Sequence, residues 1–144
     1  MVRTYPVIRS DAEWRLRLTP EQFHMLREQG VERPGTSVLV DEKRPGTFSC
    51  AGCESPLFDS RMKFESGTGW PSFKEPIPGA IDTVADDTYA GGHHSGYGAI
   101  QTELVCAMCG SHLGHVFNDG PPPNGLRYCT NGVALKFAAA ATAA

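Results

Sequence analysis

An excess of positive charge is the first thing this sequence lacks. Of its 144 residues, 13 are lysine or arginine and 16 are aspartate or glutamate, so the formal net charge is −3. Proteins that bind nucleic acid or an anionic membrane surface usually carry a basic patch, and neither is expected as a partner here. Long apolar runs and an apolar leader are also missing, so the sequence predicts a cytoplasmic protein without a transmembrane helix.

The chain also lacks an even number of cysteines, because it has five. A disulfide framework pairs its cysteines and is typical of secreted proteins. An odd count without a signal peptide therefore favours free or metal-bound thiols.

Helix and strand signals divide the chain into an N-terminal helical part and a longer β-rich part. Residues 11–18 are expected to form a short helix, and Thr19 and Gln22 form a helix start whose helix would stop at Gly30. From residue 38 onward, turns rich in glycine and proline separate four β-prone segments. These segments are 38–40, 47–49, 100–105 and 128–137.

The sequence thus predicts an α+β fold that is mainly β, with short N-terminal helices followed by antiparallel sheet. One domain is expected over residues 11–137. It would be preceded by a flexible N-terminus, residues 1–10, and followed by a low-complexity alanine-rich tail, residues 138–144.

Four of the cysteines form two C-x2-C motifs, Cys50 with Cys53 and Cys106 with Cys109. Two such turns facing each other make the tetrahedral four-sulfur site that suits zinc. The closed site leaves no position for a substrate, so the predicted zinc, one per chain, is structural. Three alternatives remain open: an iron centre, two separate redox dithiols, and ligation by His112 and His115.

The fifth cysteine, Cys129, is a candidate nucleophile. In a strand it shares a face with Arg127 and Asn131, because side chains alternate between faces. The guanidinium favours the thiolate and the amide can orient a bound group. The alternative is a buried structural cysteine.

Two further clusters offer acid–base and binding groups. His112 and His115 are the best candidates for proton transfer, because histidine titrates near neutral pH, although structural histidines are also common. Residues 119–125 form a stiff turn that could bring these histidines beside Cys129. Trp70, between glycine and proline, is typical of an aromatic wall in a ligand-binding loop.

Together these motifs resemble the methionine-R-sulfoxide reductase (type B) family over roughly residues 11–137. The resemblance rests on the paired cysteine motifs and on five separated segments, residues 18–22, 32–34, 63–73, 111–117 and 125–129. It implies two antiparallel sheets, a structural zinc distant from the active site, and an oxidoreductase of oxidative-stress repair. The implied reaction is the reduction of methionine-R-sulfoxide, free or in proteins.

The resemblance also implies roles for individual residues. Cys129 would attack the sulfoxide sulfur and become a sulfenic acid, while His115 and His112 would handle the sulfoxide oxygen and its proton. Asn131 would hold the second histidine or a water. The residues implied in substrate binding are Trp70, Arg127 and Phe117.

The sequence departs from the family pattern at three places. Thr68 stands where many members have a resolving cysteine, so thioredoxin or another external thiol would have to reduce the sulfenic acid. Gly132 stands where members commonly have serine, which removes a hydroxyl near the site. Residues 91–97 are looser than the usual pattern and receive no role.

Two other functions fit the same residues. A zinc-ribbon module that binds proteins would use Trp70 and Phe73 as an exposed patch and would not need Cys129. A thiol enzyme that reduces peroxides would need Cys129 but no stereoselectivity. Substitution of Cys129 separates the binding module from either enzyme.

Overall fold

The computed structural model describes residues 5–85 and 102–140. Within these ranges the secondary structure confirms the predicted α+β, mainly β class. The helices are α1 (Asp11–Arg17) and α2 (Pro20–Arg27), with 3-10 helices η1 (Val38–Asp41), η2 (Ser60–Met62) and η4 (Gly132–Ala134). The strands are β1 (Gly46–Cys50), β2 (Pro56–Asp59), β3 (Lys63–Phe64), β4 (Ser72–Phe73), β5 (Ile81–Ala85), β6 (Thr102–Cys106), β7 (His112–Phe117), β8 (Arg127–Thr130) and β9 (Leu135–Ala139). No helix in these ranges has the length and apolar character needed to span a bilayer.

A local sequence signal accounts for the start of α2. The Thr19 hydroxyl accepts a hydrogen bond from the Gln22 amide at 3.1 Å, and the Gln22 side chain accepts one from the Thr19 amide at 2.9 Å. This capping box satisfies amides that the first helical turn leaves free. The helix ends at Arg27, earlier than the predicted stop at Gly30, and Gln29 takes the left-handed conformation with φ of 55°.

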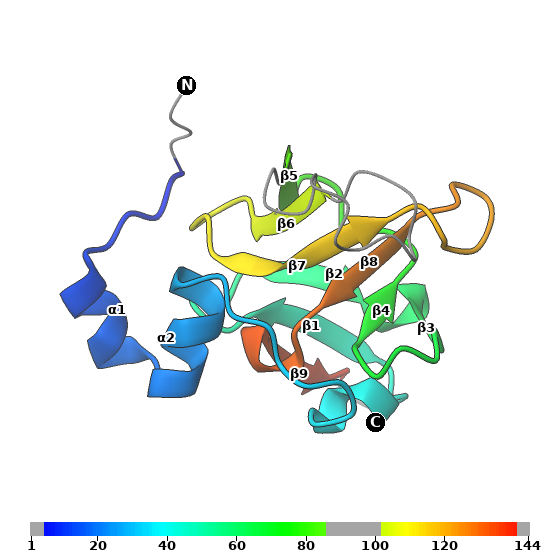
Figure 1. Cartoon of the computed structure of the whole chain (residues 1–144), viewed down its shortest axis with the longest axis horizontal. Coiled ribbons are helices and arrows are strands. Elements are labelled where there is room, and N and C mark those ends of the chain that lie inside the picture. Colours follow the sequence, from blue (N-terminus) through cyan, green and yellow to red (C-terminus); the bar gives the residue numbers. More distant parts are fainter. Residues whose placement is uncertain (1–4, 86–101, 141–144) are drawn as a thin grey trace.

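The strands form two antiparallel sheets (Figure 1). The smaller sheet has the order β2-β1-β9, and the larger has the order β3-β4-β8-β7-β6-β5. The segment predicted as one β-prone stretch, residues 128–137, is divided between them: β8 belongs to the larger sheet, η4 interrupts it, and β9 belongs to the smaller one. The chain therefore passes from one sheet to the other directly after Cys129.

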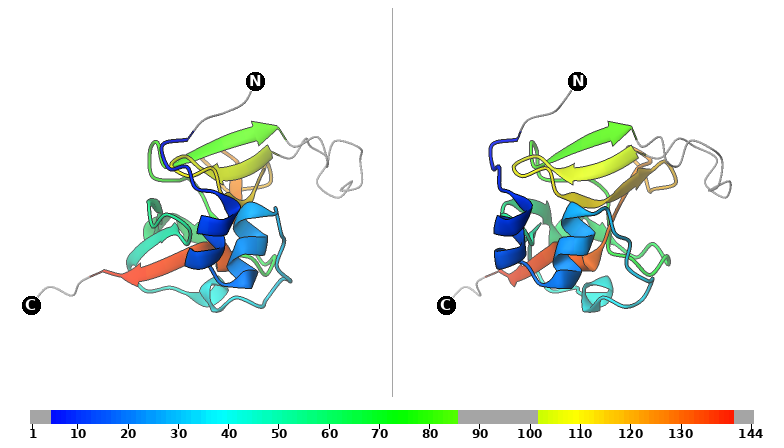
Figure 2. Two further views of the ribbon diagram at one scale, coloured as in Figure 1. Left: turned by 90° about the vertical axis from the view of Figure 1, so that its left-hand side faces the viewer. Right: turned by 60° about the vertical axis from the view of Figure 1, so that its left-hand side comes forward.

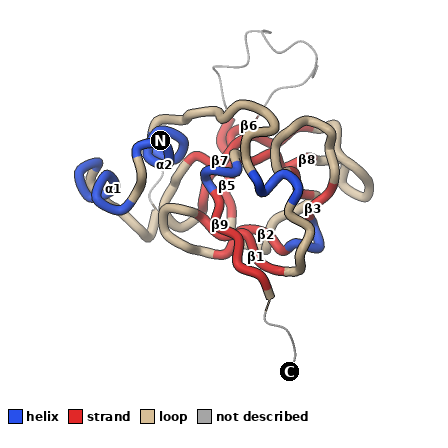
Figure 3. Tube along the Cα trace, turned by 90° about the horizontal axis from the view of Figure 1, so that it is seen from below, coloured by secondary structure: helices blue, strands red, loops and turns tan. Residues whose placement is uncertain are grey.

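An aromatic cluster joins the two sheets. The Phe73 ring of β4 stacks on Phe58 of β2 with centroids 4.1 Å apart and meets the edge of Phe48 of β1 at 5.1 Å. All three rings are completely buried. Such pairs add about 0.5–1.5 kcal/mol each beyond the burial of apolar area. Figure 3 shows the smaller sheet from below, with β1 and β9 side by side.

The two helices pack beside both sheets. Figure 2 shows α1 and α2 next to each other, with β5 and β6 above them and β9 below. Trp14 of α1 is completely buried, as is nearly all of Leu26 of α2. The helices therefore close one side of the core that the sheets share.

The local prediction for residues 38–40 differs from the structure, and two further contacts lie near the expected ends of the domain. Residues 38–40 were expected to be β-prone but lie in η1, because the Ser37 hydroxyl accepts a hydrogen bond from the Leu39 amide at 3.1 Å and turns the chain. Strand β9 extends over 138–139, inside the expected tail. In the expected flexible N-terminus, the Val7 amide donates to the turn between β6 and β7 at 2.8 Å.

Candidate active site and metal centre

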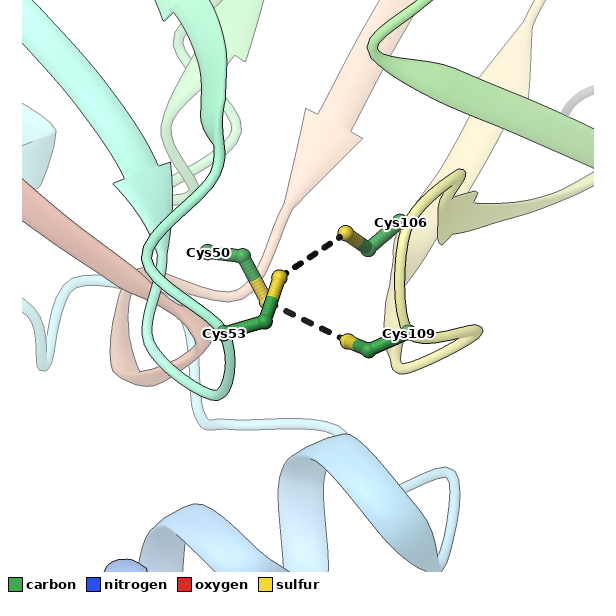
Figure 4. A group of neighbouring side chains, drawn as sticks. All are labelled: Cys50, Cys53, Cys106 and Cys109. Atoms are coloured by element: carbon green, nitrogen blue, oxygen red, sulfur yellow. Dashed lines mark hydrogen bonds between the residues drawn. The ribbon is translucent and has the colours of Figure 1, made fainter. Parts of the chain in front are cut away.

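The four cysteines of the two C-x2-C motifs meet in one cluster (Figure 4). One motif lies at the end of β1 and the other at the end of β6, so the cluster joins the two sheets. All four sulfurs lie within 4.8 Å of one another. The Sγ–Sγ distances are 3.7 Å between Cys50 and Cys109 and 3.6 Å between Cys53 and Cys106. A zinc ion with Zn–S bonds of about 2.3 Å needs sulfurs about 3.8 Å apart, so the donor set fits a tetrahedral metal.

Polar groups around the cluster fit bound thiolates. The hydroxyls of Ser55 and Ser111 lie 3.1 Å from the sulfurs of Cys53 and Cys109, and the Gly52 amide donates to a third sulfur at 3.3 Å. Hydrogen bonds with Cys106 and then Cys50 lower the pKa of Cys109 to about 7, against the opposite effects of Cys53 and of burial. The thiols thus share protons that a divalent cation would replace.

The contacts of the cluster also bear on two alternatives to a four-cysteine metal site, namely two separate redox dithiols and ligation by histidine. Sulfur–sulfur contacts of 3.7 and 3.6 Å join one motif to the other, which does not suit two independent dithiols. Within residues 5–85 and 102–140 the metal-binding group contains cysteines only. His112 instead contacts the Glu103 carboxylate, with Nδ1 to Oε2 at 2.8 Å.

Cys129 lies in a row of side chains that crosses the larger sheet. Strand β8 places it opposite Ser72 of β4 on one side and His115 of β7 on the other, and His115 is opposite Glu103 of β6. Residues directly opposite on paired strands share a face, with Cβ atoms about 4.5–5.5 Å apart. The row therefore brings together a hydroxyl, a thiol, an imidazole and a carboxylate.

The hairpin between β7 and β8 creates this row, as predicted from residues 119–125. In its turn the Gly120 amide donates to the Gly125 carbonyl, and the Gly125 amide donates to the Pro121 carbonyl, both at 3.0 Å. The turn returns the chain so that His115 and Cys129 are paired.

A β-bulge brings the second imidazole to the same place. Leu104 pairs with Gly114, but the next residue, Val105, pairs with His112, so Leu113 is an extra residue in β7. The rings of His112 and His115 then lie 5.4 Å apart, edge to face. Both are almost completely buried. The fold thus pairs His115 with Cys129 and holds the His112 ring beside that of His115.

Arg127 and Asp119 also lie near the thiol, close enough for their charges to act on it. The guanidinium makes two bonds to the Asp119 carboxylate, at 2.9 and 3.2 Å, and lies 4.3 Å from the ring centre of Phe117. Burial raises the pKa of the Cys129 thiol to about 11 and outweighs Arg127, whose charge and hydrogen bond lower it. The cation acts in the predicted direction, but Cys129 is a thiol in the free protein at neutral pH.

Asn131 and Trp70 are tied to the segment that follows α2. The Asn131 side chain accepts from the Glu32 amide at 3.0 Å and donates to the carbonyls of Gly30 and Leu113 at 3.1 and 3.4 Å. The indole of Trp70 donates to the Glu32 carbonyl at 3.0 Å. These hydrogen bonds of Asn131 go to backbone groups and not to a histidine.

Thr68, at the position of the resolving cysteine in many family members, belongs to a chain of hydroxyls. Its Oγ1 lies 2.8 Å from the Ser66 hydroxyl, which accepts a hydrogen bond from Ser72 at 2.9 Å. Ser72 is the strand partner of Cys129. Thr68 is therefore connected to the strand beside the thiol but offers no sulfur.

Another part of the chain fills the space beside Gly132. A Cβ atom on Gly132 would lie 1.9 Å from Oγ and 2.3 Å from Cβ of Ser37. The Ser37 side chain thus occupies the volume that a serine at position 132 would need. Position 132 thus lacks the hydroxyl that a serine would supply, and the Ser37 side chain, directly before η1, lies at that place.

Two carboxylates near the site, those of Glu103 and Glu32, were not among the predicted site residues. Glu103 is the acidic residue in the apolar stretch of β6, and it binds His112. Glu32 is buried, and its Oε1 accepts from the Val133 amide at 2.9 Å. An acidic residue directly before Leu104 and Val105 in a β-prone segment was the available signal for Glu103. Residues 91–97, left without a role, lie outside the described residues.

Comparison with known proteins agrees with this geometry. Residues 18–139 match the SelR domain. A protein named peptide methionine sulfoxide reductase MsrB from Agrobacterium fabrum is 52% identical over 132 residues, which cover 91% of this chain and 92% of the relative. Proteins of the same name from Leptospira interrogans and Methanosarcina barkeri are 48% and 49% identical; the matches cover 92% and 91% of this chain and 96% and 87% of those proteins. This chain therefore belongs to the SelR family of MsrB-type peptide methionine sulfoxide reductases.

Proposed function

We propose that this protein reduces methionine-R-sulfoxide, in oxidised proteins or free, to methionine. The observation that supports this best is the row across the larger sheet, in which Cys129 is paired with His115 and lies next to Arg127 on its own strand. A buried thiol with an imidazole beside it has the nucleophile and the proton donor that sulfoxide reduction requires.

The reaction exchanges one oxygen atom and two electrons. Cys129 gives up its proton and its sulfur bonds to the sulfoxide sulfur, while His115, assisted by His112, protonates the sulfoxide oxygen. The oxygen then moves to the Cys129 sulfur: a new S–O bond forms there, the substrate S–O bond and the transient bond between the two sulfurs break, methionine leaves, and Cys129 is a sulfenic acid. Because the resting pKa of Cys129 is about 11, proton transfer matters more than a preformed thiolate. A well-placed acid contributes typically about 10²–10⁴-fold.

The substrate would lie between aromatic and cationic groups. Trp70, fixed through its indole to the Glu32 carbonyl, would contact the substrate methyl group and tolerate partial positive charge on sulfur. Phe117 and Arg127 stack together and would close the opposite side. Asn131 would act through the backbone of the segment after α2, to which it is bonded.

Regeneration would require a thiol from outside the chain. Four of the five cysteines form the metal cluster and Thr68 has no sulfur. Thioredoxin or a small thiol would attack the sulfenic acid, release water and form a mixed disulfide, and a second thiol would then release Cys129. This chemistry suits a reducing compartment such as the cytoplasm.

The metal would be zinc, held by Cys50, Cys53, Cys106 and Cys109, one per chain. The sulfur distances and the closed four-sulfur set support a structural ion with no open position. When bound, zinc would hold the two turns together as a cross-link between the sheets; it would take no part in proton or oxygen transfer.

The test follows consumption of R- and S-methionine sulfoxide with dithiothreitol as reductant. The wild type should consume only the R epimer, and Cys129→Ser should consume neither while retaining its metal. Dimedone should label oxidised wild type and not Cys129→Ser. Turnover of both epimers at equal rates, or activity in Cys129→Ser, would contradict the proposal. Turnover of hydrogen peroxide alone would favour a peroxide reductase, and no turnover at all would favour a binding module.

A further inference from the structure

The buried contact between Glu103 and His112 has no part in the proposed chemistry so far. Glu103 Oε2 lies 2.8 Å from His112 Nδ1, and the side chains are only 12% and 3% exposed. A carboxylate this close accepts the Nδ1 proton, so the neutral imidazole has its lone pair on Nε2. Nε2 itself is buried and has no hydrogen-bond partner among the described residues.

A second side chain holds the same carboxylate oxygen. The Gln29 amide donates to Glu103 Oε2 at 3.0 Å. Gln29 takes a left-handed conformation, which favours glycine or asparagine after a helix. A residue that is unfavourable for this backbone conformation thus occupies a position just after α2 from which its amide reaches Glu103.

Cross-strand pairing extends the contact toward the thiol. Glu103 is directly opposite His115, which is opposite Cys129, and the rings of the two histidines are 5.4 Å apart. Glu103 therefore lies beside both imidazoles, bonded to one and in register with the other.

We infer that Glu103, held by Gln29, is a positioning residue that fixes His112 as the Nδ1-protonated tautomer and leaves Nε2 as its proton-exchanging nitrogen. This inference rests on the proposed function, since it assigns the proton route of the same site. The carboxylate also stabilises the imidazolium that forms when Nε2 takes up the thiol proton, on the route by which His115 then protonates the sulfoxide oxygen. Glu103 itself gains no proton in the cycle.

The test measures the tautomer and the turnover separately. Nitrogen-15 chemical shifts of the His112 ring in the free, metal-loaded wild type should show Nδ1 protonated and Nε2 unprotonated. In Glu103→Gln the tautomer should be mixed or reversed. Its kcat for the R-sulfoxide should fall by at least about tenfold, a part of what a placed acid supplies.

Two other variants complete the design. Gln29→Gly suits the left-handed backbone and removes only the amide, so it should fold normally and lower kcat by a smaller factor. Glu28→Gln breaks an exposed glutamate–histidine pair with His24 at 3.2 Å and serves as the matched control. It should change neither the tautomer of His112 nor kcat.

The outcomes separate this inference from the proposed function. A folded Glu103→Gln with the wild-type tautomer and kcat would overturn it. If Glu103→Gln does not fold, unchanged tautomer and kcat in Gln29→Gly overturn it. A wild type that fails to reduce the sulfoxide refutes the proposed function, while its ring shifts still decide whether Glu103 fixes the tautomer.

Discussion

The two sulfur environments of this chain differ in how much of the fold each one needs. The metal cluster is assembled from two short motifs, each local in sequence, which face each other across the two sheets. Cys129 lies inside one sheet, and its neighbours Ser72 and His115 come from separate strands. Local spacing defines the first environment, whereas strand pairing defines the second. We therefore expect the cluster to control stability and Cys129 to control reactivity.

The largest expected effect is loss of the metal. Cys106→Ser, or removal of the ion with a chelator, should unfold much of the β structure. Apparent zinc affinities of about 10–16 kcal/mol equal or exceed a typical domain stability of about 5–15 kcal/mol. Circular dichroism and metal content provide the measurement. Cys129→Ser is the matched control and should keep both the metal and the wild-type melting temperature; equal destabilisation by the two serines would contradict the comparison.

An intermediate effect is expected beside the active-site strand. Gly132→Ser should destabilise the protein by about 1–3 kcal/mol, because its Cβ would overlap Ser37. Ser37→Gly in the same chain should restore most of that loss by vacating the space. Denaturant midpoints of the two single variants and the double variant measure the coupling. Losses that simply add would mean that the two positions do not share one volume.

The smallest effect concerns the pKa of Cys129 alone. Burial raises this pKa above its usual value near 9 to about 11, so the thiolate forms only at high pH. The rate of alkylation by iodoacetamide should therefore increase with pH up to about pH 11. Asp119 contributes to the rise and binds Arg127. Asp119→Asn should therefore shift the alkylation midpoint to lower pH.

Asp59→Asn gives the control for that measurement. It removes a carboxylate from an exposed arginine pair, Asp59 with Arg61 at 3.0 Å, remote in sequence from the thiol. The Cys129 midpoint should stay at its wild-type value there. A shift toward higher pH in Asp119→Asn would show that its carboxylate acts mainly by positioning the guanidinium.

Features set by neighbouring residues could be predicted from the sequence. The capping box of α2 and each of the two C-x2-C motifs depend on groups a few positions apart. The structure contains the capping box and the cluster that the two motifs form. The turn over residues 119–125 could likewise be predicted to return the chain beside Cys129.

Features set by tertiary contacts could not be predicted in the same way. One local signal also outweighed propensity: residues 38–40 have β propensity, but the Ser37 hydroxyl accepts from the Leu39 amide and turns them into η1. Glu103 could not be connected to His112 because their contact depends on strand register. The raised pKa of Cys129 depends on burial that residue type does not reveal.

The extra residue in β7 makes the active site sensitive to chain length as well as to residue identity. In a regular strand, residues three positions apart point to opposite faces, so His112 and His115 would be separated. The bulge at Leu113 removes that separation. A one-residue deletion there would leave every side chain of the site in the sequence and still disconnect the two imidazoles.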